Sequence, residues 1–507
     1  MSISGKNLIA GEWSGDTLGG FTAIHAAENK PMQTTFADAT EQEVETAIQQ
    51  ANQAFESYHL LPALQRANFL RTIGDEILAL GDELVDMACA ETGLPSMRIQ
   101  GERGRTVGQL GLFADLLESG EYQAVIDLAD DNRQPLPKPD TRLGYLPLGV
   151  VGVFAASNFP LAFSTAGGDT ASALAAGCPV VMKAHAAHPG TAELVAQAIS
   201  RAIAKCQLHP GIFSLLQGKS YAIASQVVTH PLVKAVGFTG SERVGMILQK
   251  QINEREEPIP FYGELGSINP QFIMPNKLKA EATSTAQALV ASLMMGQGQF
   301  CTSPGIWVYV EGEGSQEFEA AAAEAVANTE AGIMLTPAIA GNYQNTVAQW
   351  QKLPNVSLLA QGKAGAEHHC SAALFQTDFA TFKNTEMLSE EVFGSSALMV
   401  RVKTLDEMYE FSRLLKGNLT ASIHAVDDDL AQSQSLARLL VHKVGRLIYN
   451  QMPTGVEVCA SMNHGGPFPA STDIRATSVG SEAIKRFQRP ICYQNMPQEL
   501  LPEPLKS

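Results

Sequence analysis

Apolar residues recur at helical spacing in two segments of the first hundred residues. Between residues 44 and 55, and again between 70 and 87, they fall on one face of a helix. Thr40 followed by Glu43 is a capping-box pattern that predicts where the first helix begins. Gly93-Leu94-Pro95 predicts where the second segment ends. These helices are expected to pack against the rest of the molecule and to carry no chemistry of their own.

From residue 141 the pattern changes to short apolar runs that alternate with helical segments. Residues 150–155 are continuously apolar, which is typical of a strand buried on both faces. Alternating strands and helices predict a parallel sheet that binds ligands at the carboxyl ends of its strands. That rule selects residues 156–158, Lys183 and residues 239–241. The predicted order is helix 171–176, strand 179–183, helix 191–203, strand 212–216, strand 233–238 and a helix that begins at Gly240-Ser241.

A second α/β region is predicted from Glu264 to the 460s. It contains an Ala-rich helix over 279–295, a loop around Cys301 and a strand over 306–310. Residues 132–145 are Pro-rich and extended, and the tail beyond residue 475 ends in Pro-rich polar sequence. These two stretches are expected to be additions to the main body.

Composition and charge narrow the class of protein. A chain of 507 residues is too long for one ordinary core, so two or three domains are expected. The net charge of −17, without a cluster of Lys and Arg, argues against nucleic-acid binding. No apolar run approaches the ~20 residues of a membrane span, and the first residues lack the pattern of a secretory signal. Seven cysteines without metal or disulfide spacing predict no metal site and a reducing cytoplasm.

Three residues stand out as candidates for chemistry, and each has a plainer alternative. Cys301 lies in a loop of small residues where backbone N–H groups can favour a thiolate, although a buried structural cysteine is the commoner case. Glu264 lies between glycines at the end of an apolar stretch, as a proton-transfer group could, or as a surface turn residue would. Asn158 follows the buried strand and could donate to an oxyanion, or simply form a turn.

Taken together and in order, five motifs resemble the aldehyde dehydrogenase superfamily over essentially the whole chain. The resemblance implies that Cys301 attacks the aldehyde carbon, that the Asn158 side chain and the Cys301 backbone N–H hold the oxyanion, and that Glu264 activates the water that releases the acid. Relatives that transfer the acyl group to coenzyme A typically lack this glutamate. The motifs are Asn158-Phe159-Pro160, Phe238-Thr239-Gly240-Ser241, Glu264-Leu265-Gly266, Gly298-Gln299-Phe300-Cys301 and Glu391-Val392-Phe393-Gly394.

The same resemblance implies an NAD(P) site. Lys183 is expected to bind the adenosine ribose, Glu391 and Phe393 the nicotinamide ribose, and the helix that begins at Gly240-Ser241 the pyrophosphate. NAD-preferring relatives often carry an acid three residues after the lysine, where this chain has Ala186. Without that acid, and with Lys219 available to attract a 2′-phosphate, NADP is expected to be preferred and NAD to remain possible. Lys219 could equally be a solvated lysine.

Several stretches resemble the branch of this superfamily that oxidises 2,5-dioxopentanoate (α-ketoglutarate semialdehyde), among them residues 453–459 and 463–469. Phe159 and Phe300 are expected to shape the aldehyde tunnel, and His464 either approaches Cys301 or serves a structural role. Arg103 and Arg105 are both candidates for the substrate carboxylate if their helix lines the entrance, and otherwise pair with Glu102 or face solvent. NADP-dependent fatty aldehyde dehydrogenases are a close alternative.

The implied fold is α/β, with two Rossmann-like parallel-sheet domains and a small β element for oligomerisation. Residues 1–131 and 146–263 would form the NAD(P)-binding domain, 264–470 the catalytic domain, and 132–145 with 471–507 the oligomerisation element. A bare two-stranded projection is unlikely to be stable alone, so a homodimer or homotetramer is expected. A non-catalytic structural relative is the alternative of another class, and the intact set of Cys301, Glu264 and Asn158 argues against it.

Overall fold

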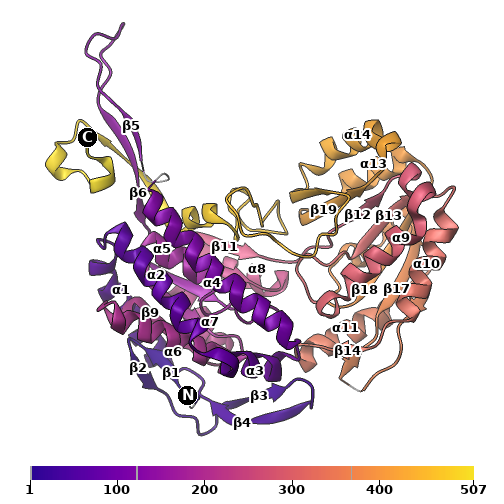
Figure 1. Cartoon of the computed structure of the whole chain (residues 1–507), viewed down its shortest axis with the longest axis horizontal. Coiled ribbons are helices and arrows are strands. Elements are labelled where there is room, and N and C mark those ends of the chain that lie inside the picture. Colours follow the sequence, from indigo (N-terminus) through magenta and orange to yellow (C-terminus); the bar gives the residue numbers. More distant parts are fainter. Residues whose placement is uncertain (1–2, 121–123, 367) are drawn as a thin grey trace.

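Two seven-stranded sheets organise the chain into two lobes, and a third, smaller sheet projects from the first lobe (Figure 1). The computed structural model describes residues 3–120, 124–366 and 368–507. The predicted α/β class with two parallel sheets is confirmed. Within the described residues, no helix combines the length and the apolar character that crossing a membrane requires.

The first sheet is parallel in its main part, with two short antiparallel strands at one edge. Chain order runs outward from β7 to β9 on one side, while β10 and β11 lie on the other side of β7. The direction of winding therefore reverses between β7 and β10, which is where such sheets bind ligands. Across the sheet the strands are β11 (Phe261–Glu264), β10 (Val233–Thr239), β7 (Val150–Phe154), β8 (Val180–Lys183), β9 (Phe213–Leu216), β1 (Asn7–Ile9) and β2 (Glu12–Ser14).

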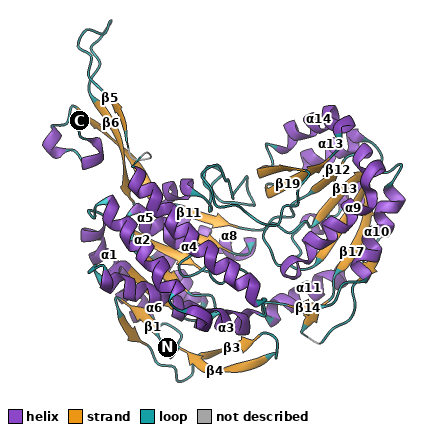
Figure 2. Cartoon of the chain, viewed as in Figure 1, coloured by secondary structure: helices purple, strands orange, loops and turns teal. Residues whose placement is uncertain are grey.

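Helices cover both faces of this sheet (Figure 2) because its strands are apolar on both sides. Val151 and Val153 pack into the core beneath α2, α4, α5 and α6, whereas Val150 and Phe154 pack with α1, α7 and α8. Successive side chains of a strand point to opposite faces, so one continuous apolar run serves two cores. The helices are α1 (Glu41–Tyr58), α2 (Ala63–Leu78), α3 (Gly81–Thr92), α4 (Ser96–Ser119), α5 (Gly168–Ala176), α6 (Pro189–Lys205), α7 (Tyr221–Thr229) and α8 (Glu242–Asn253).

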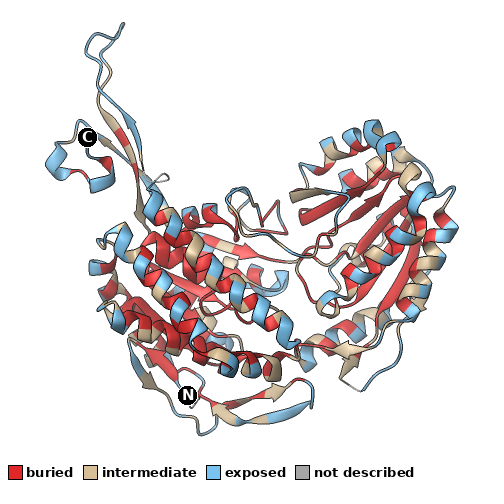
Figure 3. Ribbon diagram, viewed as in Figure 1, coloured by how far each residue is buried: buried red, intermediate tan, exposed pale blue. Residues whose placement is uncertain are grey.

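The second sheet is also parallel except for its edge strand β15. Its inner strands are buried, its edge strands β15 and β20 are only partly so, and its helices are exposed on their outer sides (Figure 3). The strand order is β15 (Ser357–Gln361), β17 (Ala373–Asp378), β18 (Ser396–Val402), β13 (Ile306–Val310), β12 (Gln271–Ile273), β19 (Asn418–His424) and β20 (Val444–Tyr449). The helices are α9 (Pro275–Met294), α10 (Ser315–Ala327), α11 (Pro337–Trp350), α12 (Phe379–Asn384), α13 (Leu405–Leu414) and α14 (Leu430–Leu440).

The projecting sheet, which we call the arm, has three strands rather than two. It consists of β21 (Gln488–Gln494), β6 (Thr141–Pro147) and β5 (Val125–Asp127), with β6 in the middle. The arm therefore takes in β5, which precedes the Pro-rich stretch, and the loop between β5 and β6 forms its tip (Figure 1). Residues 481–487 pack instead against α5 of the first lobe.

Some elements depart from the sequence-based predictions. The capping box at Thr40 is present, with Glu43 closing it, but the apolar segment 70–87 is two helices rather than one, because the chain turns at Gly81 with a φ of +59°. The pattern also misses the short hairpin β3 (Phe21–His25) and β4 (Lys30–Phe36), and the pair β14 (Gly332–Ile333) and β16 (His369–Cys370). Strands this short, or exposed on one side, give little periodic signal.

Candidate active site

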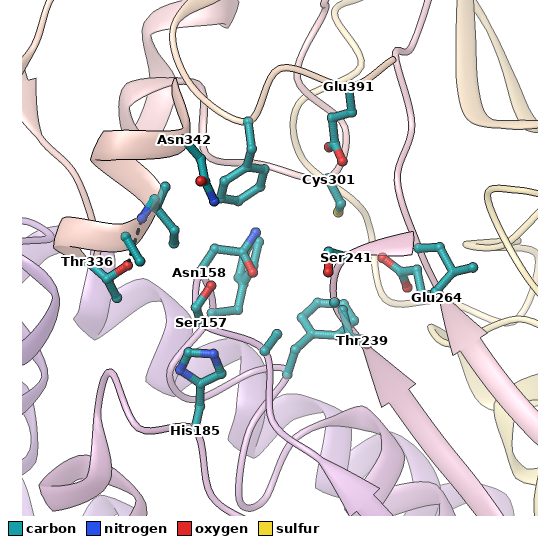
Figure 4. Close-up of a pocket in the computed structure, with 18 of the residues that line it drawn as sticks. Ser157, Asn158, His185, Thr239, Ser241, Glu264, Cys301, Thr336, Asn342 and Glu391 are labelled. Carbon is teal, nitrogen blue, oxygen red and sulfur yellow. Dashed lines mark hydrogen bonds between the residues drawn. The ribbon is translucent and has the colours of Figure 1, made fainter. Parts of the chain in front are cut away.

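A cavity of about 520 Å³ lies between the two lobes, at the carboxyl ends of the strands beside the winding reversal. Polar side chains from both lobes converge on it (Figure 4). Most of the predicted site residues line this cavity, namely Asn158, Phe159, Gly240, Ser241, Glu264, Cys301, Glu391 and Phe393. The sequence rule that selected strand ends thus located the cavity correctly.

The first lobe supplies its residues at the ends of three strands. Asn158 follows β7, and Gly240 and Ser241 follow β10. The Ser241 hydroxyl accepts a hydrogen bond from the backbone N–H of Val244 at 3.4 Å and so caps the N-terminus of α8 at the cavity wall. Glu264 is the last residue of β11. A capped helix N-terminus beside a cavity is a favourable place for a phosphate group.

Cys301 is held in a tight loop between α9 and β13. Gly298 has a φ of +66°, and a Cβ at this position would lie 2.2 Å from the carbonyl oxygen of Gly394, so only glycine fits there. The buried Asn269 side-chain amide donates to the carbonyl oxygens of Cys301, at 2.8 Å, and of Ser303, at 2.9 Å. These contacts fix the backbone that carries the thiol.

Cys301, His464 and Glu264 form a compact cluster. The Nε2 atom of His464 lies 3.5 Å from the Sγ of Cys301 and 2.9 Å from the Oε1 of Glu264. The Ser478 hydroxyl donates to the other Glu264 oxygen, Oε2, at 2.6 Å. Glu264 and His464 are 5% and 2% exposed, so these interactions occur away from bulk water. Of the two alternatives for His464, this geometry places the imidazole beside Cys301.

The cluster shifts the two key pKa values in opposite directions. Burial raises the pKa of Glu264, but the charge and hydrogen bond of His464 and the hydroxyl of Ser478 outweigh it, and the net pKa falls below its usual value. Burial, followed by the negative charges of Glu264 and Glu391, raises the pKa of the Cys301 thiol well above its usual range. The site therefore holds an ionised carboxylate beside a protonated thiol, with an imidazole positioned between them.

The donor atoms of Cys301, His464 and Glu264 lie within 4.8 Å of one another. Such a set could hold a metal, since zinc accepts sulfur, nitrogen and oxygen ligands. It also places the thiol of Cys301 within reach of a carboxylate and of an imidazole nitrogen, either of which can accept its proton. The cluster borders a cavity, and the side-chain amide of Asn158 lies near enough to donate to an oxyanion. These features support a nucleophilic cysteine rather than a metal site.

Asn158 lies next to the segment that carries the nucleophile. Its side-chain Nδ2 donates to the carbonyl oxygen of Gln299 at 2.9 Å, two residues before Cys301. A primary amide carries two N–H groups. The second N–H is therefore available, among the described residues, to an oxygen that develops negative charge near Cys301.

The two lysines predicted for the cofactor do not line the cavity. The Nζ of Lys183 donates to the carbonyl oxygens of Ala184, at 2.9 Å, and Gly218, at 2.6 Å. Burial lowers the pKa of Lys183 to about 8. The Nζ of Lys219 lies 5.0 Å from the centre of the Phe21 ring. His185, two residues after Lys183, does point into the cavity (Figure 4), and no motif singled it out.

Aromatic rings surround the reacting groups on the side away from Ser241. The Phe159 ring lies 5.3 Å from the rings of both Phe300 and Phe163, and the Phe163 ring lies 6.0 Å from the imidazole of His464. Phe159 and Phe163 line the cavity, whereas Phe300 is buried behind them. We call these three phenylalanines the aromatic wall.

Arg103 is not at the site. Its Nη1 donates to the carbonyl oxygen of Gly81 at 2.7 Å, at the break between α2 and α3. The reason is helical geometry, since each residue of α4 turns the side chain by about 100°. Arg105, two residues further along α4, therefore points in a different direction, toward the Phe163 ring.

Three residues that hold the site together carried no usable signal in the sequence. Asn269, Ser478 and His185 are common polar residues in loops, and only their contacts reveal their role. Asn269 supports the Cys301 loop, and Ser478 binds Glu264 from a segment 214 residues further along the chain. Contacts over such separations are not accessible to local sequence patterns.

Comparison with known proteins defines the class to which this fold and site correspond. The model of the aldehyde dehydrogenase family matches residues 14–487. The chain belongs to this family, whose members use NAD(P), and it is an oxidoreductase that acts on aldehydes.

Two similar relatives are more specific. The chain is 48% identical to alpha-ketoglutaric semialdehyde dehydrogenase 2 of Azospirillum brasilense, with 100% of this chain and 97% of the relative covered. It is 43% identical to alpha-ketoglutaric semialdehyde dehydrogenase of Acinetobacter baylyi, with 99% and 96% covered.

Solved structures agree on the fold. A point mutant of betaine aldehyde dehydrogenase from Staphylococcus aureus, solved in complex with NAD+, superposes with a TM-score of 0.83 at 20% identity, over 98% of this chain and 99% of that chain. A 1-pyrroline-5-carboxylate dehydrogenase gives a TM-score of 0.82 at 20% identity, over 96% and 92%.

Proposed function

We propose that this chain oxidises α-ketoglutarate semialdehyde to 2-oxoglutarate, with NADP as the preferred oxidant. The observation that carries the proposal is the contact of Cys301 with His464 and of His464 with Glu264 beside the cavity. The two relatives of high identity over the full chain support the choice of substrate. In the balanced reaction an aldehyde, water and NADP+ give a carboxylate, NADPH and two protons.

Cys301 is the nucleophile in this proposal. The ionised Glu264 carboxylate, whose donor atom lies within 4.8 Å of the thiol, takes the thiol proton as sulfur bonds to the aldehyde carbon, and passes that proton to solvent. This step forms a thiohemiacetal. The free N–H of Asn158 and the backbone N–H of Cys301 then stabilise the oxyanion. NAD(P), when bound, accepts the hydride that leaves this carbon, and a thioester on Cys301 remains.

Glu264 removes that thioester by activating a water molecule. Its lowered pKa keeps it ionised near neutral pH, as a base must be, and Ser478 holds its second oxygen. A base in this position favours hydrolysis over transfer of the acyl group to coenzyme A. Product formation that is independent of coenzyme A would support this assignment, and a strict requirement for it would contradict it.

The residues around the cavity fit a dinucleotide. The N-terminus of α8 presents Gly240 and Ser241 to a pyrophosphate, and Glu391 also lines the cavity, where a ribose could reach it (Figure 4). Ala186 packs against the cluster that contains Phe21, and the Lys219 ammonium lies over the Phe21 ring. Phe21 therefore lies beside both Ala186, which carries no acidic group to repel a 2′-phosphate, and Lys219, whose ammonium would attract one. This arrangement supports NADP over NAD.

The aromatic wall favours a second candidate substrate. Three phenylalanine rings beside Cys301 offer an apolar surface that would suit the chain of a fatty aldehyde. The mechanism would be unchanged. The dependence of turnover on aldehyde chain length distinguishes the two candidates, since only a fatty aldehyde dehydrogenase would prefer long chains.

Reduction of NADP, followed by the absorbance of NADPH, tests the proposal directly. The purified protein is supplied with α-ketoglutarate semialdehyde, with hexanal or longer aldehydes, and with NAD in place of NADP. Turnover of the semialdehyde that is lost in Cys301→Ala would support the assignment. A preference for long aldehydes would replace the substrate, and the absence of turnover with every aldehyde would contradict the function.

We also propose the expected division of labour among the segments. Residues 1–131 and 146–263 bind the dinucleotide, and residues 264–470 carry the nucleophile. The arm, with residues 132–145 and the tail from β21 onward, pairs with another copy of the chain, whereas residues 471–487 of the expected element lie against the two lobes. The exposure of all three residues of β5 at the edge of the arm supports pairing with a second copy.

A further inference from the structure

Three charged residues of α4 share one helical face next to the catalytic loops. Arg98, Glu102 and Arg105 are spaced i, i+4 and i+7, which places them in a row along a helix. The guanidinium carbon of Arg98 lies 4.5 Å from the centre of the Phe159 ring and 4.7 Å from that of Phe300. Phe159 follows Asn158 in the chain and Phe300 precedes Cys301, so Arg98 packs against the two segments that carry the reacting groups.

Glu102 is fully occupied by its neighbours. Its Oε1 accepts hydrogen bonds from the backbone N–H groups of Leu161, at 2.9 Å, and Ala162, at 3.0 Å, in the loop that follows Asn158. Its Oε2 lies 3.3 Å from Nη2 of Arg98. The carboxylate therefore holds the Asn158 loop and partly neutralises Arg98, and it makes no hydrogen bond to Arg105 in the described part of the chain.

Arg105 is half-buried, and two of its three guanidinium nitrogens have no hydrogen-bond partner among the described residues. Its Nε and Nη2 atoms are inaccessible to solvent and make no hydrogen bond to any described residue. The guanidinium carbon lies 5.6 Å from the centre of the Phe163 ring, which in turn contacts His464. Two enclosed N–H groups without acceptors are costly, because they have left water without replacing its hydrogen bonds, and the nearby charge of Glu102 offsets this only in part. Such a group is poised to receive a carboxylate.

A third arginine shows the contrast. The charge of Arg446 also reaches Cys301, but its Nη1 and Nη2 donate to the carbonyl oxygens of Gly455, at 2.9 Å, and Pro453, at 2.6 Å. Arg446 is therefore committed to the loop after β20. Of the arginines near the nucleophile, Arg105 has the greatest unused capacity to donate.

We propose that Arg105, flanked by Arg98, binds the carboxylate at the far end of a short dicarboxylic semialdehyde. This inference rests on the proposed function and names the residues that select its substrate. Neither arginine lines the cofactor cavity, whereas Phe159 and Phe163 do, so the aromatic wall separates the arginine side from the cofactor side. The Phe163 ring lies between the two ends of such a substrate, since it is 5.6 Å from the guanidinium carbon of Arg105 and 6.0 Å from the imidazole that contacts Cys301. A fork of N–H donors matches a carboxylate, and an unsubstituted fatty chain offers no group to match it.

Kinetics with paired substrates test the proposal. Glutarate semialdehyde and pentanal have the same chain length and differ in the terminal carboxylate. In Arg105→Met, kcat/KM for glutarate semialdehyde is expected to fall roughly 10- to 100-fold, while kcat/KM for pentanal stays within about twofold. Arg105→Lys keeps the positive charge but loses the paired N–H donors of the guanidinium. Its kcat/KM for glutarate semialdehyde should lie between those of the wild type and Arg105→Met. Arg103→Met, on the same helix but bonded to Gly81, is the matched control and should leave the ratio of the two substrates unchanged.

Protection of Cys301 from alkylation tests the same subsite without turnover. In the wild type, and in Arg103→Met, 2-oxoglutarate is expected to slow the reaction of Cys301 with iodoacetamide, and in Arg105→Met this protection should be lost. Equal protection in Arg105→Met, or an equal loss of kcat/KM with pentanal and the semialdehyde, would overturn the proposal. If the protection depends on Arg105 but no aldehyde is oxidised, the proposed function fails while the subsite stands. Pentanal oxidation and the thermal midpoint report whether each variant is folded.

Discussion

At the residue scale, the site holds two neighbouring acids in opposite protonation states. Glu264 and Cys301 are both enclosed, yet the pKa of the carboxyl falls and that of the thiol rises. The difference arises because Glu264 receives hydrogen bonds and positive charge from His464, whereas Cys301 faces the negative charge of Glu264. Each residue therefore affects the reactivity of the other.

This coupling predicts the reactivity of the thiol in the protein without cofactor. Only the thiolate reacts with iodoacetamide, so a raised pKa means that the alkylation rate of Cys301 keeps increasing through pH 9. Removal of the neighbouring charge in Glu264→Gln should lower the thiol pKa and speed alkylation at pH 8 roughly three- to tenfold. Residue-specific mass spectrometry measures the rate, with the exposed Cys492 as an internal reference. A slower reaction in Glu264→Gln would contradict the electrostatic account.

His464 should control the acid side of the pH profile. Its charge and hydrogen bond lower the pKa of Glu264 against the effect of burial. In His464→Asn the effect of burial dominates and the pKa of Glu264 rises. Less of the base is then ionised near pH 6, and the acid limb of the kcat profile moves to higher pH. Ser478→Ala removes one hydrogen bond and should cause a smaller shift in the same direction. An unchanged acid limb in His464→Asn would show that this contact does not set the pKa.

The sequence predicts the site residues that belong to motifs. It does not predict residues whose role depends on which way their side chains point from a helix. Cys301, Glu264 and Asn158 lie in short distinctive stretches, and the cavity contains all three. The sequence offers Arg103 and Arg105 as partners of a substrate carboxylate, and Arg103 faces Gly81, whereas Arg105 faces the aromatic wall. Arg98, which faces the same wall, was not among the candidates. The i, i+4, i+7 spacing of Arg98, Glu102 and Arg105 shows that they share one face of α4. The sequence does not show that this face, rather than another, packs against the site.

At the element scale, apolar periodicity predicts the helices but not where they break. The segment 70–87 has one continuous apolar pattern, and both halves are buried in the same core. The chain nevertheless turns between α2 and α3, because Gly81 adopts a left-handed conformation that other residues rarely take. The N-terminal strands are missed for a different reason, since β1 and β2 have three residues each and cannot display a period.

Alanine substitutions at two glycines of neighbouring helices should have opposite effects on stability. At Gly81, with a φ of +59°, no atom lies within 4 Å of an added Cβ, so Gly81→Ala costs only backbone strain, about 1 kcal/mol. The thermal midpoint is expected to fall by about 1 °C. Gly101→Ala, in the exposed helical part of α4 with similar open space, should raise it slightly. Thermal unfolding by circular dichroism measures both, and a rise in Gly81→Ala would contradict the strain argument.

At the scale of the whole molecule, the alternation of strands and helices predicts two parallel sheets, but not the order of their strands. Only the structure reveals that β10 lies beside β7, so that the ends of strands 80 residues apart form one wall of the cavity. The arm is predicted only in outline, because the partner strands β6 and β21 are separated by more than 300 residues. Pairings over such distances depend on tertiary packing rather than on local pattern.

The exposed edge of the arm leads to the last prediction. Val125 and Ile126 of β5 are 56% and 40% exposed, and β5 is an edge strand with its outer side unpaired in the described structure. Apolar edge strands associate readily, so a second copy is expected to cover this edge. Replacing both residues with lysine should shift the mass measured by light scattering toward that of one chain, while Leu430→Lys with Val441→Lys, equally exposed on the distant α14 region, should not (Figure 1). A wild type that is already monomeric, or an arm variant that assembles as the wild type does, would contradict this role of the arm.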